Sequence, residues 1–153
     1  RGGDEATAKV LLELGADVNG APGDSLKPLY EAAREGNEEV AEILVEKGAD
    51  VRSPDPLGRS ALHAAIENDH TGVAEFLIER GAAVQERDGR GNTLLHLAAA
   101  NGNMQLTEML LDRGVDRQLR NNQGKTALEL ALGKNHLHTA RILDPEIMNK
   151  FEP

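Results

Sequence analysis

Several side chains in this sequence are of the kinds that bind metals or catalyse reactions. Five histidines are candidate zinc ligands or general bases, but His136 and His138 stand two residues apart on a predicted helix and so point to different faces. Gly124-Lys125-Thr126 matches only the end of a phosphate-binding loop, because the upstream glycine and strand are missing. The chain has no Cys, which excludes thiolate ligands and nucleophiles. The sequence therefore predicts no metal site, no cofactor and no catalytic centre.

The composition excludes two classes of partner. Hydrophobic residues make up 39% and charged residues 28% of the 153 residues, which is typical of a folded chain. The net charge of −9 argues against a surface that neutralises phosphates, and the 2% of aromatic residues leave no row of rings for bases. The apolar runs are too short for a membrane span. We expect neither nucleic acid nor membrane as a partner.

The elements that position these side chains repeat every 33 residues. Glycines, leucines and alanines all keep this step, in the series Gly15, Gly48, Gly81, Gly114; Gly58, Gly91, Gly124; Leu29, Leu62, Leu95, Leu128; and Ala32, Ala65, Ala98, Ala131. A fixed step of this length is typical of a repeated helical unit rather than of one globular core.

Each repeat contains the local signals of a turn followed by two helices. Asp55, Asp88 and Asn121 begin segments that end in glycine three residues later, as type I turns do. The predicted N-caps are Ser60, Thr93 and Thr126, with Glu129 completing a capping box, whereas Lys27 is a poor cap before Pro28. Apolar residues line one face of each helix: Leu62, Ala65, Ile66 and Leu95, Ala98, Ala99 in first helices, and Val40, Ile43, Leu44, Val73, Phe76, Leu77, Leu106, Met109, Leu110 in second helices. The units must therefore stack, and Gly48, Gly81 and Gly114 are expected to end the second helices in the left-handed conformation.

These residues resemble the ankyrin repeat family, whose unit has this length and a Thr-Pro-Leu-His-x-Ala signature. The signature is matched at 60–65, 93–98, 126–131 and, more degenerately, 27–32, and the family's Gly-Ala-Asp-Val segment stands at 15–18 and 48–51. The resemblance covers nearly the whole chain. It implies an all-α fold, an ankyrin-repeat solenoid of stacked helix-turn-helix units with protruding β-turn or hairpin fingers.

The register divides the chain, taken as a single ankyrin-repeat domain, into six segments. They are a truncated N-terminal half repeat at 1–21, full repeats at 22–54, 55–87 and 88–120, a C-terminal capping repeat at 121–145 and a tail at 146–153. Because the first segment lacks its own first helix, we expect a fragment of a longer protein.

The resemblance also implies a function, that of a non-catalytic scaffold that binds a protein or peptide in a concave groove of finger tips and first helices. It further implies that His63 and His96 hydrogen-bond between repeats and, with the lack of Cys, that the protein is intracellular, in the cytoplasm or nucleus. Carried onto the family's variable positions, the expected partner-binding residues are Arg34, Pro56, Leu57, Arg59, Glu67, Asn68, Arg87, Arg90, Asn92, Asn101, Arg120, Asn122, Gln123 and Lys125.

The charge of the fingers indicates what kind of partner they bind. The segments 49–59, 82–92 and 115–125 hold seven basic and five acidic residues, a balance of +2, so the rest of the chain holds −11. Turn acids such as Asp55 and Asp88 are expected to bond locally and leave the arginines available. The hypothesis is a partner segment with Asp, Glu or phosphate, held by Arg59, Arg87, Arg90 and Arg120. The other interpretation is that arginine is there only as a polar finger-tip residue.

Three further hypotheses remain beside the scaffold role. In the first, the repeats are the targeting or regulatory arm of a larger enzyme or channel whose catalytic part precedes residue 1. Gly2-Gly3-Asp4-Glu5 resembles the start of a cyclic-dinucleotide synthase signature, but Ala6 replaces its Phe and the segment fits an inter-helix turn. Asn19 resembles the hairpin asparagine that oxygen-sensing hydroxylases modify in ankyrin proteins, and its other interpretation is a hydrogen-bonding turn residue.

Overall fold

The computed structural model describes residues 9, 12–13, 15–20, 27–55 and 57–150. The chain divides into two compact units, Arg1–Ala83 and Val84–Pro153, which are called the N-terminal unit and the C-terminal unit.

The N-terminal unit contains two helix pairs. Its helices are α2 (Pro28–Glu35), α3 (Glu38–Glu46), α4 (Ala61–Glu67) and α5 (Thr71–Glu79). Helix α2 packs against α3 and α4, while α5 packs against α3 and α4, so that first helices meet first helices and second helices meet second helices. Leu62, Ala65 and Leu77 are fully buried between these layers.

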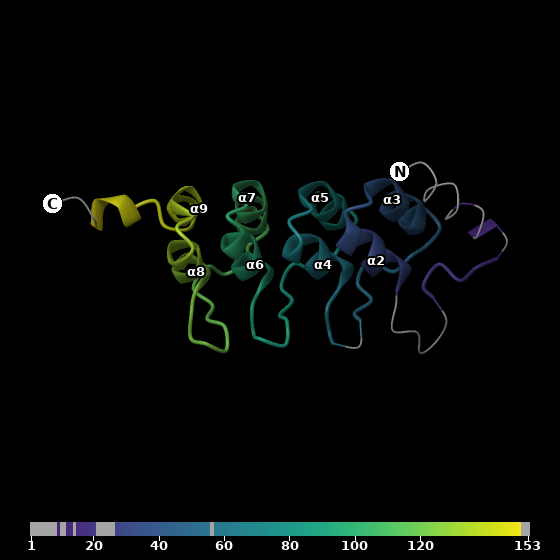
Figure 1. Cartoon of the computed structure of the whole chain (residues 1–153), viewed down its shortest axis with the longest axis horizontal. Helices are drawn as coiled ribbons and strands as arrows, with labels where there is room; N and C mark the ends of the chain where they lie inside the picture. Colours follow the sequence, from purple (N-terminus) through teal and green to yellow (C-terminus); the bar gives the residue numbers. More distant parts are fainter. Residues whose placement is uncertain (1–8, 10–11, 14, 21–26, 56, 151–153) are drawn as a thin grey trace. The chain divides into compact units, whose positions relative to one another are not determined.

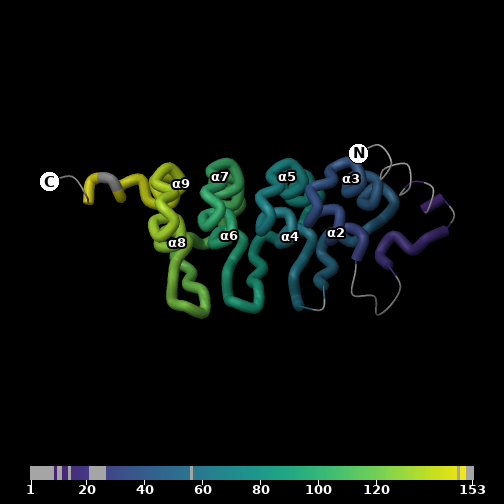
Figure 2. The backbone as a smooth tube through the Cα atoms, viewed as in Figure 1, coloured from purple at the N-terminus to yellow at the C-terminus, as the bar shows by residue number. Residues whose placement is uncertain are grey.

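The C-terminal unit repeats this arrangement with α6 (Leu94–Asn101), α7 (Met104–Asp112), α8 (Ala127–Gly133) and α9 (Leu137–Leu143). Figure 1 shows α6 and α8 in one layer and α7 and α9 in the other. A short 3₁₀ helix, η1 (Ile147–Lys150), packs on α9 and buries Ile147. Figure 2 shows the segment between α7 and α8 as a loop that extends beyond the helices.

The all-α prediction is confirmed. Across the described ranges, β-structure is limited to one isolated bridge between Arg87 and Thr93, so the fingers are turns rather than paired strands. None of the helices in the described part of the chain has the length and apolar character to cross a membrane.

The predicted helix ends are confirmed as well. Ser60, Thr93 and Thr126 are N-caps whose side chains accept a backbone N–H from the third helical residue. Lys27 makes no capping bond, and Pro28 is the first residue of α2. Gly48, Gly81 and Gly114 follow the second helices with φ of 96°, 89° and 77°. The predicted core positions are buried except Val40 and Met109, which are half-buried.

Two histidines join consecutive helix pairs by packing on a glycine of the preceding pair. In the C-terminal unit, the ring of His136 lies over Gly102, where a Cβ would be 2.6 Å from Nδ1, and Nε2 lies 3.1 Å from the Ala100 carbonyl oxygen. His70 has the same relation to Gly36 and to the Arg34 carbonyl in the N-terminal unit, at 3.0 Å. The prediction that His136 lies on a helix was wrong, because it is the N-cap residue of α9.

His96 links the two helix pairs of the C-terminal unit, as the resemblance implied. Its Nδ1 accepts the Thr93 backbone N–H at 3.1 Å, and its Nε2 lies 2.8 Å from the Lys125 carbonyl oxygen, to which it donates. Both bonds together require the neutral ring with its proton on Nε2. Burial is the main cause that lowers the pKa of His96, with the Arg87 charge acting in the same direction. A buried neutral histidine is therefore part of this junction.

We predict that Gly102→Ala destabilises the fold more than Gly124→Ala does. Both glycines have a left-handed φ, 70° and 72°, but a Cβ at Gly124 meets nothing within 4 Å. Alanine in this left-handed conformation therefore costs each variant about 1–2 kcal/mol. At Gly102 the new Cβ also displaces the His136 ring, and the loss of the ring's hydrogen bond adds about 0.5–1.5 kcal/mol to the destabilisation. Urea unfolding followed by circular dichroism measures both, and equal losses, or an excess that persists on a His136→Ala background, would contradict the packing.

We predict that the cost of His96→Gln is largest at neutral pH and shrinks in mild acid. Glutamine keeps an acceptor for the Thr93 N–H, as Glu129 does in the next repeat, but loses the bond to Lys125, at about 0.5–1.5 kcal/mol. Because the pKa of folded His96 is lowered, the unfolded chain binds its proton first below about pH 6.5, and the parent chain loses stability as the pH falls. Urea midpoints at pH 7.5 and 5.5 should converge. A difference that stays constant would refute this role.

Candidate functional site

The three finger turns, 55–59, 88–92 and 121–125, have the same backbone hydrogen bonds. In the first, Gly58 N–H donates to the Asp55 carbonyl at 3.0 Å and Asp55 N–H to the Arg59 carbonyl at 2.7 Å. The Asp55 carboxylate oxygen Oδ1 accepts the N–H groups of Leu57 and Arg59 at 2.9 and 2.8 Å. Asp88 and Asn121 make the equivalent four bonds in their own turns. The first, third, fourth and fifth residues of each turn are thus held by the same backbone bonds.

The side chain of Arg59 is bonded to other residues of the N-terminal unit. Its Nε and Nη2 lie 3.0 and 2.9 Å from Asp55 Oδ2, and its guanidinium lies 5.4 Å from the centre of the Tyr30 ring. Burial acts to raise the pKa of the Asp55 carboxyl, but the bonds from Arg59 and Leu57 outweigh it and lower that pKa. The expectation that Asp55 leaves the arginine available was wrong, since Arg59 is itself a partner of this carboxylate.

The other expected binding residues of the N-terminal unit are mostly engaged with neighbours. Arg34 pairs with Glu31 and Glu35, both at 2.8 Å. Glu67 lies 4.0 Å from Arg59, and Asn68 donates to the Ala64 carbonyl. Leu57 is the exception, because this residue of the turn is 69% exposed. Pro56 lies outside the described residues.

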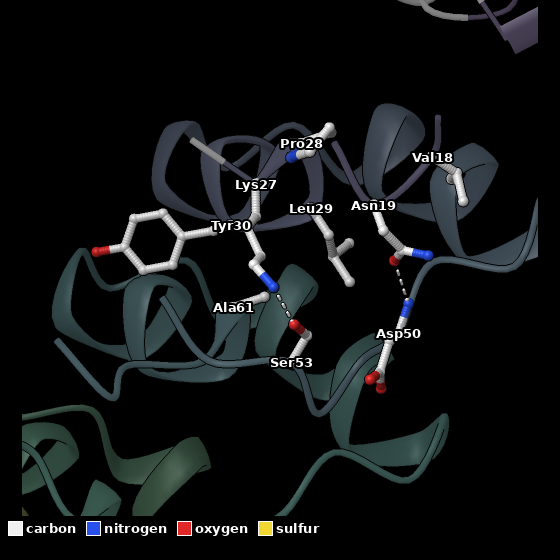
Figure 3. A pocket seen from close by; sticks show the side chains of 9 residues that line it. All are labelled: Val18, Asn19, Lys27, Pro28, Leu29, Tyr30, Asp50, Ser53 and Ala61. Atoms are coloured by element: carbon white, nitrogen blue, oxygen red, sulfur yellow. Dashed lines mark hydrogen bonds between the residues drawn. The ribbon is translucent and has the colours of Figure 1, made fainter. Parts of the chain in front are cut away.

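A small pocket lies beside the start of α2 (Figure 3). Its space of about 10 Å³ holds about one water molecule. Lys27 Nζ donates to Ser53 Oγ, and Asp50 N–H donates to Asn19 Oδ1 at 2.9 Å, so these groups satisfy one another. The Tyr30 ring points away from Lys27 and Asn19. The pocket is a packed junction between fingers rather than a substrate site, and Asn19 has the bonds of a turn residue.

In the C-terminal unit, the amide of Asn92 stands where Arg59 stands in the 55–59 turn, and the amide of Asn121 stands where Asp55 stands. Asn92 Nδ2 donates to Asp88 Oδ2 at 3.1 Å, and Asn92 Oδ1 accepts Asn121 Nδ2 at 2.8 Å. Asn122 N–H donates to the Arg90 carbonyl at 3.0 Å. The turns 88–92 and 121–125 are therefore bonded to each other through side chains and backbone.

This arrangement leaves cations at the surface of the two joined turns. Arg87 donates through Nη1 to the Arg120 carbonyl at 3.2 Å, and Arg120 donates to the Gly124 carbonyl at 2.6 Å and faces Glu129 at 3.3 Å. Arg87 is anchored on backbone oxygens and Arg120 on a backbone oxygen and the Glu129 carboxylate, in each case through Nη1, and the other guanidinium N–H groups have no bond to a described residue. Within the described residues, no hydrogen bond or ion pair involves the side chains of Arg90 or Lys125, and both are exposed. Asp88, by contrast, bonds locally as expected.

The side chains that the sequence left open for chemistry are structural or lie apart. The described part of the chain contains no group of three His, Asp or Glu side chains placed to hold a metal ion. Gln123 is exposed on the last finger turn, and Asn101 ends α6 with bonds of its own. Gly2-Gly3-Asp4-Glu5 lies outside the described residues. Tyr30, His70 and His136 were missed as contact residues because their partners are set by tertiary packing.

Comparison with known proteins agrees with the geometry. One family model, described as ankyrin repeats (3 copies), matches residues 1–88, and a second, ankyrin repeats (many copies), matches residues 77–131. A search of curated proteins found no match. Members of this family typically mediate protein–protein interaction and are typically non-catalytic. The repeat length, the capped helix pairs and a family match over more than half of the chain together place this protein in the ankyrin repeat family.

Proposed function

We propose that this chain is a non-catalytic protein-binding module whose C-terminal unit binds an acidic segment of a partner protein through the finger turns 88–92 and 121–125. The observation that carries the proposal is the set of cations on these turns. Arg87, Arg90, Arg120 and Lys125 stand against two carboxylates, Asp88 and the Arg120 partner Glu129, a balance of +2 in a chain of net −9. An anionic segment is the ligand that such a local charge attracts.

The bonds of the turns support a preorganised site. The finger backbones are fixed by hydrogen bonds within and between the turns, so that binding orders few groups beyond the arginine and lysine side chains. Arg87 and Arg120 are anchored through single Nη1 atoms and can each offer a second edge of the guanidinium to a carboxylate or phosphate. Arg90 and Lys125 complete the site as exposed charges.

We predict that charge reversal at Arg90 and Lys125 abolishes selection of acidic peptides. Random dodecapeptides displayed on phage are selected on the intact chain, on Arg90→Glu/Lys125→Glu and on Arg113→Glu/Arg141→Glu. The last pair is a matched control, because it makes the same change of net charge at two exposed arginines, the C-cap residue of α7 and a residue of α9. Peptides rich in Asp and Glu should come from the intact chain and the control alone.

The affinity of one selected peptide, measured by fluorescence anisotropy, should fall at least about tenfold in Arg90→Glu/Lys125→Glu, since each lost charged hydrogen bond is worth about 1.5–3 kcal/mol. It should also weaken as salt rises. Tighter binding by a phosphoserine version of the peptide would identify phosphate as the preferred charge. Peptides without excess Asp or Glu, or acidic peptides lost equally from the control, would disprove the acidic site.

A further inference from the structure

The third residue of each finger turn is presented by the same backbone but has a different chemistry. These residues are Leu57, Arg90 and Gln123. In all three turns, the residue's own N–H donates to the side-chain oxygen at the first turn position, at 2.9, 2.9 and 3.0 Å. Because the backbone is held the same way, the side chain at this position decides what the turn can bind.

The fifth residue of the turn has an internal role instead. Arg59 pairs with Asp55 and covers Tyr30, and Asn92 bonds to Asp88 and Asn121. The arginine of the 55–59 turn therefore makes its contacts within the fold. The arginine of the 88–92 turn stands instead at the third position.

The surface around Tyr30 in the N-terminal unit is unsuited to an acidic ligand. The Arg59 guanidinium lies 5.4 Å from the centre of the Tyr30 ring and faces Asp55 and Glu67, while burial raises the pKa of the Tyr30 phenol, Arg59 opposes that rise, and Asp55, Glu67 and Glu31 add to it. With Glu35 and Arg34, four carboxylates stand against two guanidinium groups, a balance of −2. Both guanidinium groups already face carboxylates of the same surface. A partner carboxylate would meet net negative charge there.

We propose that Leu57 and Tyr30 bind a partner segment of the opposite kind, an apolar side chain that packs on Leu57 beside a Lys or Arg that faces Tyr30 and Glu67. The inference rests on the proposed peptide-binding role of the fingers. Leu57 is the most exposed of the three large apolar residues found exposed in the described part of the chain, at 69% against 49% and 47% for Leu137 and Met104. It stands on a turn held by four hydrogen bonds, so little order is lost when its side chain is covered.

A basic neighbour completes the match. The half-buried Tyr30 ring offers a phenol oxygen that no described residue bonds, and Glu67 keeps a side chain that is 53% exposed beside Arg59. A lysine or arginine of the partner would add a donor to this net negative surface. The two finger regions thus select different ligands although they share one backbone design.

The same phage selection tests this inference through a second class of peptides. Selection on the intact chain should return peptides with Leu, Ile, Met or Phe next to Lys or Arg, separate from the acidic class. Leu57→Ser should remove this class and lower the affinity of a representative peptide about tenfold. Leu137→Ser is the matched control, because it makes the same change at an exposed leucine of α9. Glu67→Gln should relax the requirement for the basic residue.

The outcomes separate this inference from the proposed function. An apolar and basic class that survives Leu57→Ser, or that Leu137→Ser removes equally, would overturn the Leu57 site. Acidic peptides alone would overturn it as well, while the acidic site of the C-terminal unit would stand. Apolar and basic peptides alone, lost from Leu57→Ser and kept by Arg90→Glu/Lys125→Glu, would support it and overturn the acidic site.

Discussion

The fingers depend on one side-chain oxygen in each turn. Oδ1 of Asp55, Asp88 or Asn121 accepts two backbone N–H groups that lie two and four residues further along, and the turn closes around it. Without that acceptor the N–H groups would compete for water or for the partner, and the tip would lose its fixed shape. Both carboxylate and amide satisfy this role, so the charge of the first residue is adjustable. Neighbouring side chains can then bond to the first residue only through the part that this oxygen does not use.

The helices provide the frame but have little stability of their own. Helices of seven to nine residues are too short to persist in isolation, and they form here because each buries an apolar face on its neighbours. The joints are polar, with His70 over Gly36 and His136 over Gly102, each bonded to a carbonyl at the end of the preceding first helix. A polar bond at a defined position fixes the register of stacking, which apolar contact between alanines and leucines does not do alone.

The sequence predicts the frame well because its signals are local and repeated. A turn acid, a glycine three residues later and a Ser or Thr cap predict their own hydrogen bonds, and the structure has them at Asp55, Gly58 and Ser60. What the sequence does not predict is which partner a long side chain takes. Arg59 and Arg90 are both finger arginines, yet one bonds to a carboxylate four residues back and lies over an aromatic ring, while the side chain of the other makes no such contact with a described residue. The position of an arginine within the turn decides which partner its side chain takes, whereas the amino-acid composition does not distinguish the two arginines.

Local charge, rather than net charge, therefore governs what such a chain attracts. A net charge of −9 repels an acidic segment at long range. Salt screens that repulsion beyond about 8–10 Å, a distance that spans only a few surface residues. At shorter range a paired guanidinium contributes less than an unpaired one, because its own carboxylate offsets part of its charge. Arg59, half-buried and paired with Asp55, adds little to an anion site by this criterion, whereas Arg90 adds a full charge. Exchange of an arginine between the third and fifth turn positions would thus change the ligand without changing the composition, and repeats of this family can diverge in specificity while their folding signals stay constant.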